Sequence, residues 1–326
     1  MLEKHAAELK FALDAIRARK DTINHFYFVG CGGSKAVFGP AEYLFDEETD
    51  VPASVYSSNE FCHRLPKAFT RDSVVITCSH SGNTPETVNA CQLAKDKGAI
   101  AICFTNVEGS PLWNAANCPI HYSYREDPTP AENQPYMMMY LLFGILDILA
   151  PNEKYQRALK CIPALDGIYT RNTAAYAARA AEFGQKYRRE QMIYTMGSGA
   201  CYSVAYSFAI CLLMEMQWIH SHAIHSGEYF HGPFEVTDFD VPFIVIKSID
   251  ACRPLDDRAY QFCAAHSDKV TLIDCAEFDM TGIDEDLRGY FAPLVADKVL
   301  RSYAVELADK RGHKLDVRRY MWRMKY

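Results

Sequence analysis

Residues 73–87, SVVITCSHSGNTPET, constrain the fold of this chain more than any other stretch. An apolar, β-branched run leads into small hydroxyl residues and one glycine, and a helix-forming segment follows, which predicts a strand, a loop and a helix in that order. The loop hydroxyls, the backbone at Gly82 and the free N–H groups of the next helix suit a phosphate group. A surface loop that caps a helix would use the same residue types and is the commoner outcome.

The composition of this loop limits its ligand. It has no lysine and lacks the G-x-x-x-x-G-K-[ST] spacing of nucleoside triphosphate sites, so a nucleotide with magnesium is disfavoured and a small phosphomonoester is favoured. The hydroxyl groups that could bind such a phosphate belong to Ser79, Ser81 and Thr84.

A second loop of this kind follows an earlier predicted strand, residues 26–29. It is not a dinucleotide-binding fingerprint, because Lys35 stands where the third glycine belongs and would obstruct close packing of helix on strand. The turn is instead a second phosphate-type loop, made by Gly30, Gly32, Gly33 and Ser34.

Strands and helices alternate through the first half of the chain. Further strands are expected at residues 52–57 and 99–106, with a helix at 84–97 between them. Loops that carry Gly and Ser follow the carboxyl ends of the strands. The pattern predicts an α/β fold with a doubly wound parallel sheet flanked by helices, of the flavodoxin-like kind, with a ligand at its switch point.

The same order of elements returns about 166 residues later, which predicts two similar α/β halves. Residues 191–211 repeat the strand, the Gly/Ser turn and the helix. In the second copy the loop reads KSIDACRP and loses the S-x-S-G-x-T pattern. We therefore expect one phosphate site per chain, in the first half.

The length of 326 residues fits about two domains by the usual size of domains. The sequence predicts an N-terminal helix (1–25), a first α/β domain with the phosphate loops (26–150) and a helical connector (151–190). A second α/β domain (191–310) and a C-terminal tail (311–326) complete the chain.

The charge and the apolar segments limit the partners. A net charge of −7 and a pI near 5.9 argue against nucleic acid or an anionic membrane as the partner. The charged N-terminal twenty residues do not resemble a signal peptide. The fifteen-residue run 136–150 is shorter than the roughly 20 residues that span a bilayer, so it predicts a buried or subunit-interface helix ahead of a methionine-rich ligand groove. We expect a cytoplasmic protein.

Twelve cysteines are scattered along the chain, and no pair is spaced as C-x-x-C. Several stand inside apolar runs that resemble strands. Reduced, mostly buried thiols explain this distribution better than disulfides or zinc.

Residues 212–236 hold four histidines and three glutamates within 25 positions. An apolar helix around Glu215 would place its carboxylate in low-dielectric surroundings, as general acid/base catalysis uses. A glutamate on the polar side of an amphipathic helix fits the spacing about as well. The proline of His231-Gly-Pro predicts a helix start that gives His231 a defined direction.

The histidines also raise the question of a metal site. Zinc could be held by His220 and His222 together with His225 or His231. The spacing H-x-H-x-x-H matches no standard ligand pattern closely, and histidines that cap a helix or bond the backbone are more common. We expect no metal.

These motifs together resemble the sugar isomerase (SIS) family, as in the isomerase half of glucosamine-6-phosphate synthase. The resemblance rests on Cys31 to Ser34, on SHSGNT and on the Glu215 and His231 pair, and it covers both halves of the chain. It implies two SIS domains, a homodimer or higher oligomer with shared active sites, and a sugar-phosphate substrate. It also implies phosphate ligands in the two loops, namely Ser34, Ser79, His80, Ser81 and Thr84.

In that family the glutamate matching Glu215 moves a proton between C1 and C2, and the histidine matching His231, often from the partner subunit, assists ring opening. The run WIHSHAIHSGEYFHGPFEV most resembles the fructosamine 6-phosphate deglycases, hydrolases that yield glucose 6-phosphate and an amino acid without a cofactor. The resemblance leaves two alternatives open: an aldose-ketose or amino-sugar phosphate isomerase or deaminase, and a non-enzymatic sugar-phosphate sensor. Further substrate contacts are expected at Gly33, Gly82, Asn83, Glu228 and Arg323.

The C-terminal tail departs from the synthase pattern, in which a tail lysine forms an imine with the ketose. Counting from Asp316 puts Arg323 in that place, with Lys325 two residues further on. Arginine cannot form the imine at neutral pH, which favours a substrate that carries its own amine. Arg318, Arg319 and Arg323 could instead bind a carboxylate or phosphate, or form a solvated basic tail.

Overall fold

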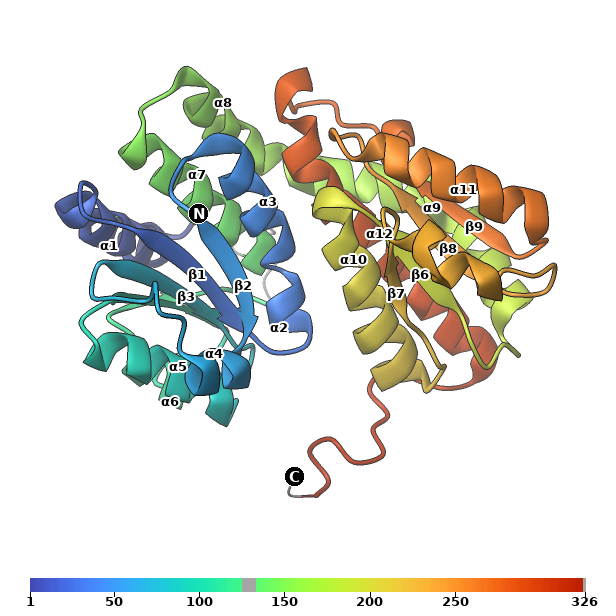
Figure 1. Cartoon of the computed structure of the whole chain (residues 1–326), viewed down its shortest axis with the longest axis horizontal. Helices are drawn as coiled ribbons and strands as arrows, with labels where there is room; N and C mark the ends of the chain where they lie inside the picture. Colours follow the sequence, from blue (N-terminus) through green and yellow to red (C-terminus); the bar gives the residue numbers. More distant parts are fainter. Residues whose placement is uncertain (125–132, 325–326) are drawn as a thin grey trace. The chain divides into compact units, whose positions relative to one another are not determined.

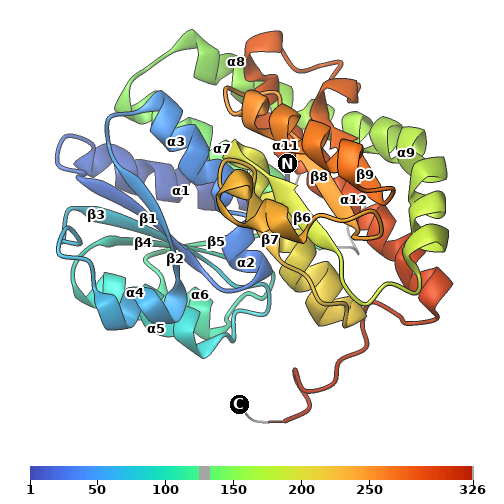
Figure 2. The ribbon, with the colours of Figure 1, turned by 45° about the vertical axis from the view of Figure 1, so that its right-hand side comes forward.

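The computed structural model describes residues 1–124 and 133–324. The chain divides into two compact units, Met1–Asp166 and Gly167–Tyr326. Each unit contains one parallel β-sheet with helices on its faces (Figures 1 and 2). The predicted α/β class with parallel sheets is confirmed.

The first unit has a five-stranded sheet in the order β2-β1-β3-β4-β5. Helices α4, α5 and α6 cover one face, and α1, α3 and α7 cover the other (Figure 1). Its elements are α1 (Glu3–Arg19), β1 (His25–Gly30), α2 (Gly33–Ala36), α3 (Gly39–Glu48), β2 (Ala53–Ser57), α4 (Ser58–Arg64), β3 (Ser73–Cys78), α5 (Pro85–Asp96), β4 (Ile100–Thr105), α6 (Pro111–Ala115), β5 (Cys118–His121), α7 (Gln134–Leu149), α8 (Glu153–Cys161) and η2 (Ile162–Ala164).

The register of the first sheet brings the two Gly/Ser loops to one edge. Gly30, the last residue of β1, is the partner of Cys78, the last residue of β3. Strand β2 pairs with the other side of β1, so the strand order reverses between β1 and β3. This is the switch point at which open parallel sheets bind their ligands.

The second unit has a four-stranded parallel sheet in the order β7-β6-β8-β9. Helix α11 covers one face, and α10 packs on the other. Its elements are α9 (Leu165–Tyr187), β6 (Tyr194–Gly197), η3 (Gly199–Cys201), α10 (Tyr202–Ser207), the π-helix η4 (Phe208–Met216), β7 (Ala223–His225), η5 (Tyr229–His231), η6 (Pro233–Val236), β8 (Phe243–Lys247), α11 (Arg253–His266), β9 (Val270–Asp274), η7 (Cys275–Glu277), η8 (Glu285–Leu287) and α12 (Arg288–Arg311).

The two sheets repeat one local design. The order β7-β6-β8-β9 matches β2-β1-β3-β4, and the strand ends Gly30 and Gly197 are 167 residues apart. Two residues after each strand end a glycine takes a positive φ, 55° at Gly32 and 51° at Gly199. Only glycine adopts this conformation without strain, so both units turn in the same way from the first strand into the helix.

Two apolar helices lie largely in the interior. Eleven of the sixteen residues of α7 are buried, and α7 packs against α1 and α8, which supports the buried alternative for 136–150. Among the described residues, the run Gly199–Met216 alone is long and apolar enough to cross a membrane, and half of it is buried inside the structure. Core helices of globular proteins meet the same criterion.

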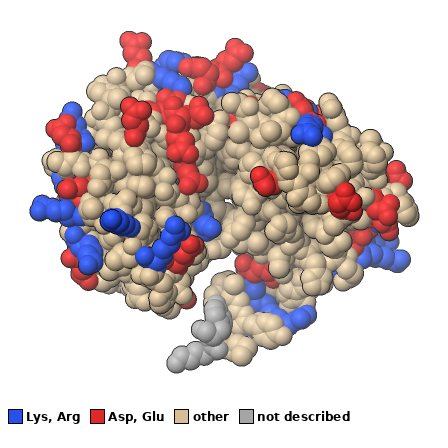
Figure 3. Space-filling view, viewed as in Figure 1, with Lys and Arg blue, Asp and Glu red and all other residues tan. Residues whose placement is uncertain are grey.

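The cysteines are free thiols, nine of them buried and three partly exposed. This confirms the prediction of mostly buried, reduced thiols. On the face shown in Figure 3, acidic and basic side chains are interspersed.

Candidate active site

Ser34 lies in the first turn of α2, directly after β1. The register of β1 and β3 places this turn beside Cys78, the last residue of β3. Burial raises the pKa of the Cys78 thiol to about 12, although Ser34, Gln134 and Tyr122 act against this rise through hydrogen bonds. The thiol is therefore neutral at physiological pH and adds no negative charge beside a bound phosphate.

The loop after β3 places two predicted phosphate ligands side by side. The hydroxyl oxygens of Ser79 and Thr84 are 2.9 Å apart. Thr84 is the N-cap of α5, yet within the described residues its side chain caps none of the first-turn N–H groups. The sequence allowed a simple helix-capping role for this loop, but the Thr84 side chain does not cap α5.

The other members of this loop differ in their surroundings. The Nδ1 atom of His80 is 3.1 Å from the Tyr122 hydroxyl, so the ring is held toward the end of β5. Ser81 and Asn83 are exposed, and the Asn83 N–H donates to Ser81 Oγ over 3.2 Å. The structure thus brings Ser79 and Thr84 together and places Ser34 in the turn after the neighbouring strand. It leaves Ser81 open to solvent and engages one nitrogen of His80.

Gly82 is required by the packing of the loop itself. Its φ is 65°, and a Cβ added there would stand 2.0 Å from Ser110 Oγ and 2.9 Å from Thr105 Oγ1. The space that a side chain would fill is thus occupied by the protein itself. Tight packing of the loop on Ser110, the N-cap of α6, therefore requires a glycine here. Close approach of a ligand to its backbone stays a prediction.

Alanine at Gly82 should lower the free energy of unfolding by about 2–5 kcal/mol, as left-handed strain of about 1–2 kcal/mol adds to overpacking of about 1–3 kcal/mol. Gly109 is the matched control, because its φ is 70° and none of the described residues lies within 4 Å of its added Cβ. Gly109→Ala should cost only about 1–2 kcal/mol. Urea unfolding measures both variants, and equal losses would contradict the packing argument.

The equivalent edge of the second unit is occupied by carboxylates. Asp250 accepts hydrogen bonds from the Ser248 hydroxyl and the Cys252 N–H, each over 2.8 Å. The Ala200 N–H, in the turn after β6, lies 3.4 Å from its other oxygen. The carboxylate of Asp250 therefore occupies the hydroxyl and N–H donors that a bound phosphate would need at this edge.

Asp256 is fully buried beside it. It accepts hydrogen bonds from the hydroxyls of Ser198 and Ser226 over 2.7 and 2.6 Å, and from the Ser248 N–H over 2.9 Å. Burial raises the pKa of this carboxyl group, and the three serines oppose the rise. These internal carboxylates support the prediction of a single phosphate site, in the first half, because a phosphate at this edge would meet negative charge.

Glu215 lies near the end of η4, and its side chain is 24% exposed. Its Oε1 atom is 2.7 Å from Nη2 of Arg318, a tail residue whose side chain is only 8% exposed. The sequence allowed two settings for Glu215, an apolar one and the polar side of a helix, and neither included the buried guanidinium that faces the carboxylate. This pair leaves no signal in the sequence, because the two residues are far apart in the chain and Arg318 stands in a polar tail.

The chain beside Glu215 has an unusual backbone. The segment Phe208–Met216 is π-helical, and Trp218 has a φ of 56°. Both features are rare, and both concentrate at functional sites. They mark the turn after η4 as a place where packing holds the backbone in a strained conformation.

The remaining predicted residues of the second unit lie on or near short helices. His231 ends η5 and is exposed, and η6 begins with Pro233, as the sequence predicted. Glu228 and Arg323 are also exposed, whereas Lys325 lies outside the described residues. In residues 1–124 and 133–324, no three His, Cys, Asp or Glu side chains are grouped to hold a metal ion.

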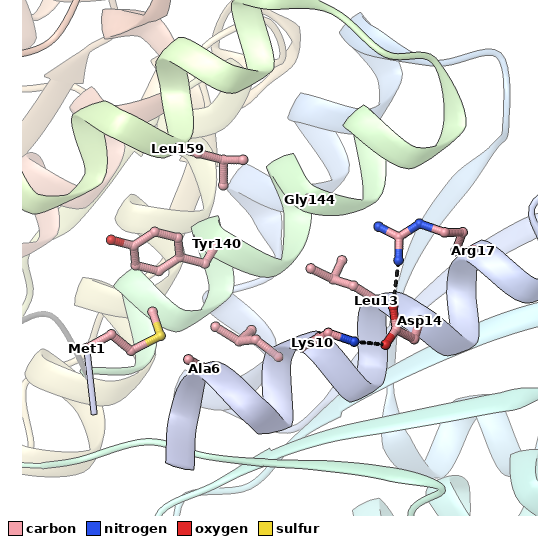
Figure 4. A pocket seen from close by; sticks show the side chains of 10 residues that line it. Met1, Ala6, Lys10, Leu13, Asp14, Arg17, Tyr140, Gly144 and Leu159 are labelled. Carbon is pink, nitrogen blue, oxygen red and sulfur yellow. Dashed lines mark hydrogen bonds and ion pairs between the residues drawn. The ribbon is translucent and has the colours of Figure 1, made fainter. Parts of the chain in front are cut away.

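A groove of about 380 Å³ lies between α1, α7 and α8 of the first unit (Figure 4). Apolar side chains such as Leu13 and Tyr140 line it, and Lys10 and Arg17 both bond Asp14 at its rim. Among the described residues, its lining includes none of the predicted site residues.

Comparison with known proteins identifies the family. The model of the SIS domain matches residues 22–146. The chain is 47% identical to fructosamine deglycase FrlB of Bacillus subtilis (strain 168) over 94% of this chain and 93% of that protein. It is 29% identical to fructoselysine 6-phosphate deglycase of Escherichia coli (strain K12) over 97% of this chain and 90% of that protein.

A solved structure agrees with this result. A Bacillus subtilis protein described as a candidate phosphosugar isomerase superposes with a TM-score of 0.95 at 44% identity, with all of both chains covered. The chain therefore belongs to the SIS family. The family resemblance predicted from the sequence motifs is confirmed.

Proposed function

We propose that this protein is a deglycase that hydrolyses a fructosamine 6-phosphate to glucose 6-phosphate and a free amino acid. The observation that carries the proposal is the 47% identity to fructosamine deglycase FrlB over nearly the whole chain. The deglycase from Escherichia coli, which is matched over 97% of this chain, supports the same activity.

The chemistry follows from the substrate and from Glu215. The substrate is a ketone at C2 with a secondary amine on C1. Glu215 takes a proton from C1 to give an enaminol, and protonation at C2 converts the enaminol to an imine between C1 and nitrogen. Water then adds to C1, the C1–N bond breaks, and the nitrogen leaves as the amine. One water is consumed, and no electrons enter or leave.

His231 acts before this step in the proposal. It moves a proton to the ring oxygen O5 as the cyclic sugar opens, which exposes the C2 ketone. Its exposed position at the end of η5 supports a role toward a ligand or a partner subunit.

The phosphate anchors the unreactive end of the substrate. Ser34, Ser79 and Thr84 lie at the switch point of the first sheet, where N–H groups at the start of α5 add to the hydroxyls. In this proposal the second unit is a second SIS domain, the tail covers the active site, and the enzyme is a cytoplasmic homodimer with shared sites.

A coupled assay for glucose 6-phosphate tests the proposal. The protein is given a panel of fructosamine 6-phosphates that differ only in the amine, with lysine and aspartate among them. We expect release of glucose 6-phosphate, with a preference that identifies the natural amine. No release from the panel, together with interconversion of fructose 6-phosphate or glucosamine 6-phosphate, would identify an isomerase or deaminase. Binding without any turnover would identify a sensor.

A further inference from the structure

The tail residue Arg318 makes contacts on two sides. Its Nη2 is 2.7 Å from Glu215 Oε1, and its Nη1 donates to the carbonyl oxygens of Leu315 and Val317 over 2.7 and 2.9 Å. The guanidinium carbon also lies 5.3 Å from the centre of the Trp322 ring. Arg318 thus joins the fold of its own tail to the carboxylate of Glu215.

The tail is held against the strained turn after η4 by further contacts. Arg319 lies over the Trp218 ring, 4.3 Å from its centre, and Gln217 Nε2 donates to the His313 carbonyl oxygen over 2.8 Å. The Trp218 and His313 rings meet edge to face at 4.4 Å. These contacts hold the tail segment around Arg318 in a fixed position relative to the segment around Glu215.

The contact between Arg318 and Glu215 is made at Oε1, which lies 2.7 Å from Nη2. Among the described residues, no hydrogen bond is made to Oε2 of Glu215. A carboxylate that is fixed through one oxygen points the second in a constant direction, as proton transfer between neighbouring carbons requires.

We propose that Arg318 is a positioning residue for Glu215, which holds Oε1 so that Oε2 is the atom that moves the proton between C1 and C2. This inference rests on the proposed function, because it assigns Glu215 as the proton carrier. The ion pair between Arg318 and Glu215 is an observation that does not depend on that assignment.

The geometry requires arginine. A planar guanidinium can bind backbone oxygens with one nitrogen and a carboxylate with the other, whereas a lysine ammonium is a single compact charge. Lysine at position 318 would keep the charge facing Glu215 but lose part of the anchor in the tail. We therefore expect Arg318→Lys to rescue part of the activity that Arg318→Met loses.

Steady-state kinetics with a fructosamine 6-phosphate tests the role. Arg318→Met should lower kcat about 100-fold and change KM by less than about threefold, as expected when orientation of a reacting group is lost. Arg318→Lys should stay within about tenfold of the wild-type kcat. Lys314→Gln, which removes an exposed charge from the same tail, should leave both constants unchanged.

Two kinetic outcomes would overturn the proposal. A large rise in KM at constant kcat would make Arg318 a substrate-binding residue. Equal losses in the Met and Lys variants would leave only a structural role in the tail.

Amide hydrogen exchange of residues 315–322 tests the ion pair without any turnover. Arg318→Met and Glu215→Gln should each speed exchange in this segment, and the double variant should exchange no faster than Arg318→Met alone, because residues in contact are not additive. Effects that multiply would show that the two side chains act independently and would overturn the inference. If wild type releases no glucose 6-phosphate while exchange shows coupling, the proposed function fails and the ion pair stands.

Discussion

Glu215→Gln should lower the kcat for glucose 6-phosphate release by about 10³-fold or more, because the amide cannot take the proton from C1. The substitution keeps the size of the side chain and its place near the end of η4, 24% exposed beside Arg318. The phosphate loops belong to the first unit, so binding of the substrate's phosphate end should not change.

Because phosphate binding and proton transfer use different residues, the two can be measured separately. Affinity for glucitol 6-phosphate, which has no carbonyl group and cannot react, is compared by calorimetry in wild type and Glu215→Gln and should agree within about twofold. Glu285→Gln, an exposed change in the same unit, is the matched control for kcat. Turnover that survives in Glu215→Gln would remove this residue from the mechanism.

Removal of the paired hydroxyls in the phosphate loop should weaken substrate binding, whereas Glu215→Gln should lower kcat and leave binding unchanged. The double variant Ser79→Ala, Thr84→Val deletes the two oxygens that lie 2.9 Å apart at the start of α5. Hydrogen bonds to a charged group are each worth about 1.5–3 kcal/mol, so glucitol 6-phosphate should bind at least about 100-fold more weakly.

The kinetic effect should fall mainly on KM, since the phosphate contact is made in the ground state and the transition state alike. Thr22→Val is the control, because the hydroxyl that it removes bonds the Arg19 carbonyl oxygen at an exposed turn and, among the described residues, nothing else. Unchanged affinity for glucitol 6-phosphate in the double variant would place the phosphate elsewhere.

The first sheet could be predicted closely because its signals are local. The helix expected at 84–97 is α5, Pro85–Asp96, and the strand expected at 99–106 is β4, Ile100–Thr105. β-Branched runs, glycine turns and a proline at the helix start fix such elements within a few residues of sequence. Strand β5, Cys118–His121, was missed, because four residues with a proline give no clear pattern.

The candidate site could be predicted only in part. Glu215 stood out because a charged residue inside an apolar run is costly, yet its partner Arg318 could not be found, since pairing across the chain leaves no local pattern. The loss of the phosphate loop in the second half was visible in the sequence. Its replacement by Asp250 needed the structure, although an aspartate in place of loop hydroxyls is a signal that could have been read.

One measurement tests the central claim most directly. Wild type is incubated with fructoselysine 6-phosphate, and glucose 6-phosphate and free lysine are quantified over the time course by coupled assay and mass spectrometry. The deglycase mechanism predicts that both products rise together in a one-to-one ratio and that neither forms with Glu215→Gln. Consumption of the substrate without release of lysine, or release of lysine with fructose 6-phosphate in place of glucose 6-phosphate, would contradict it.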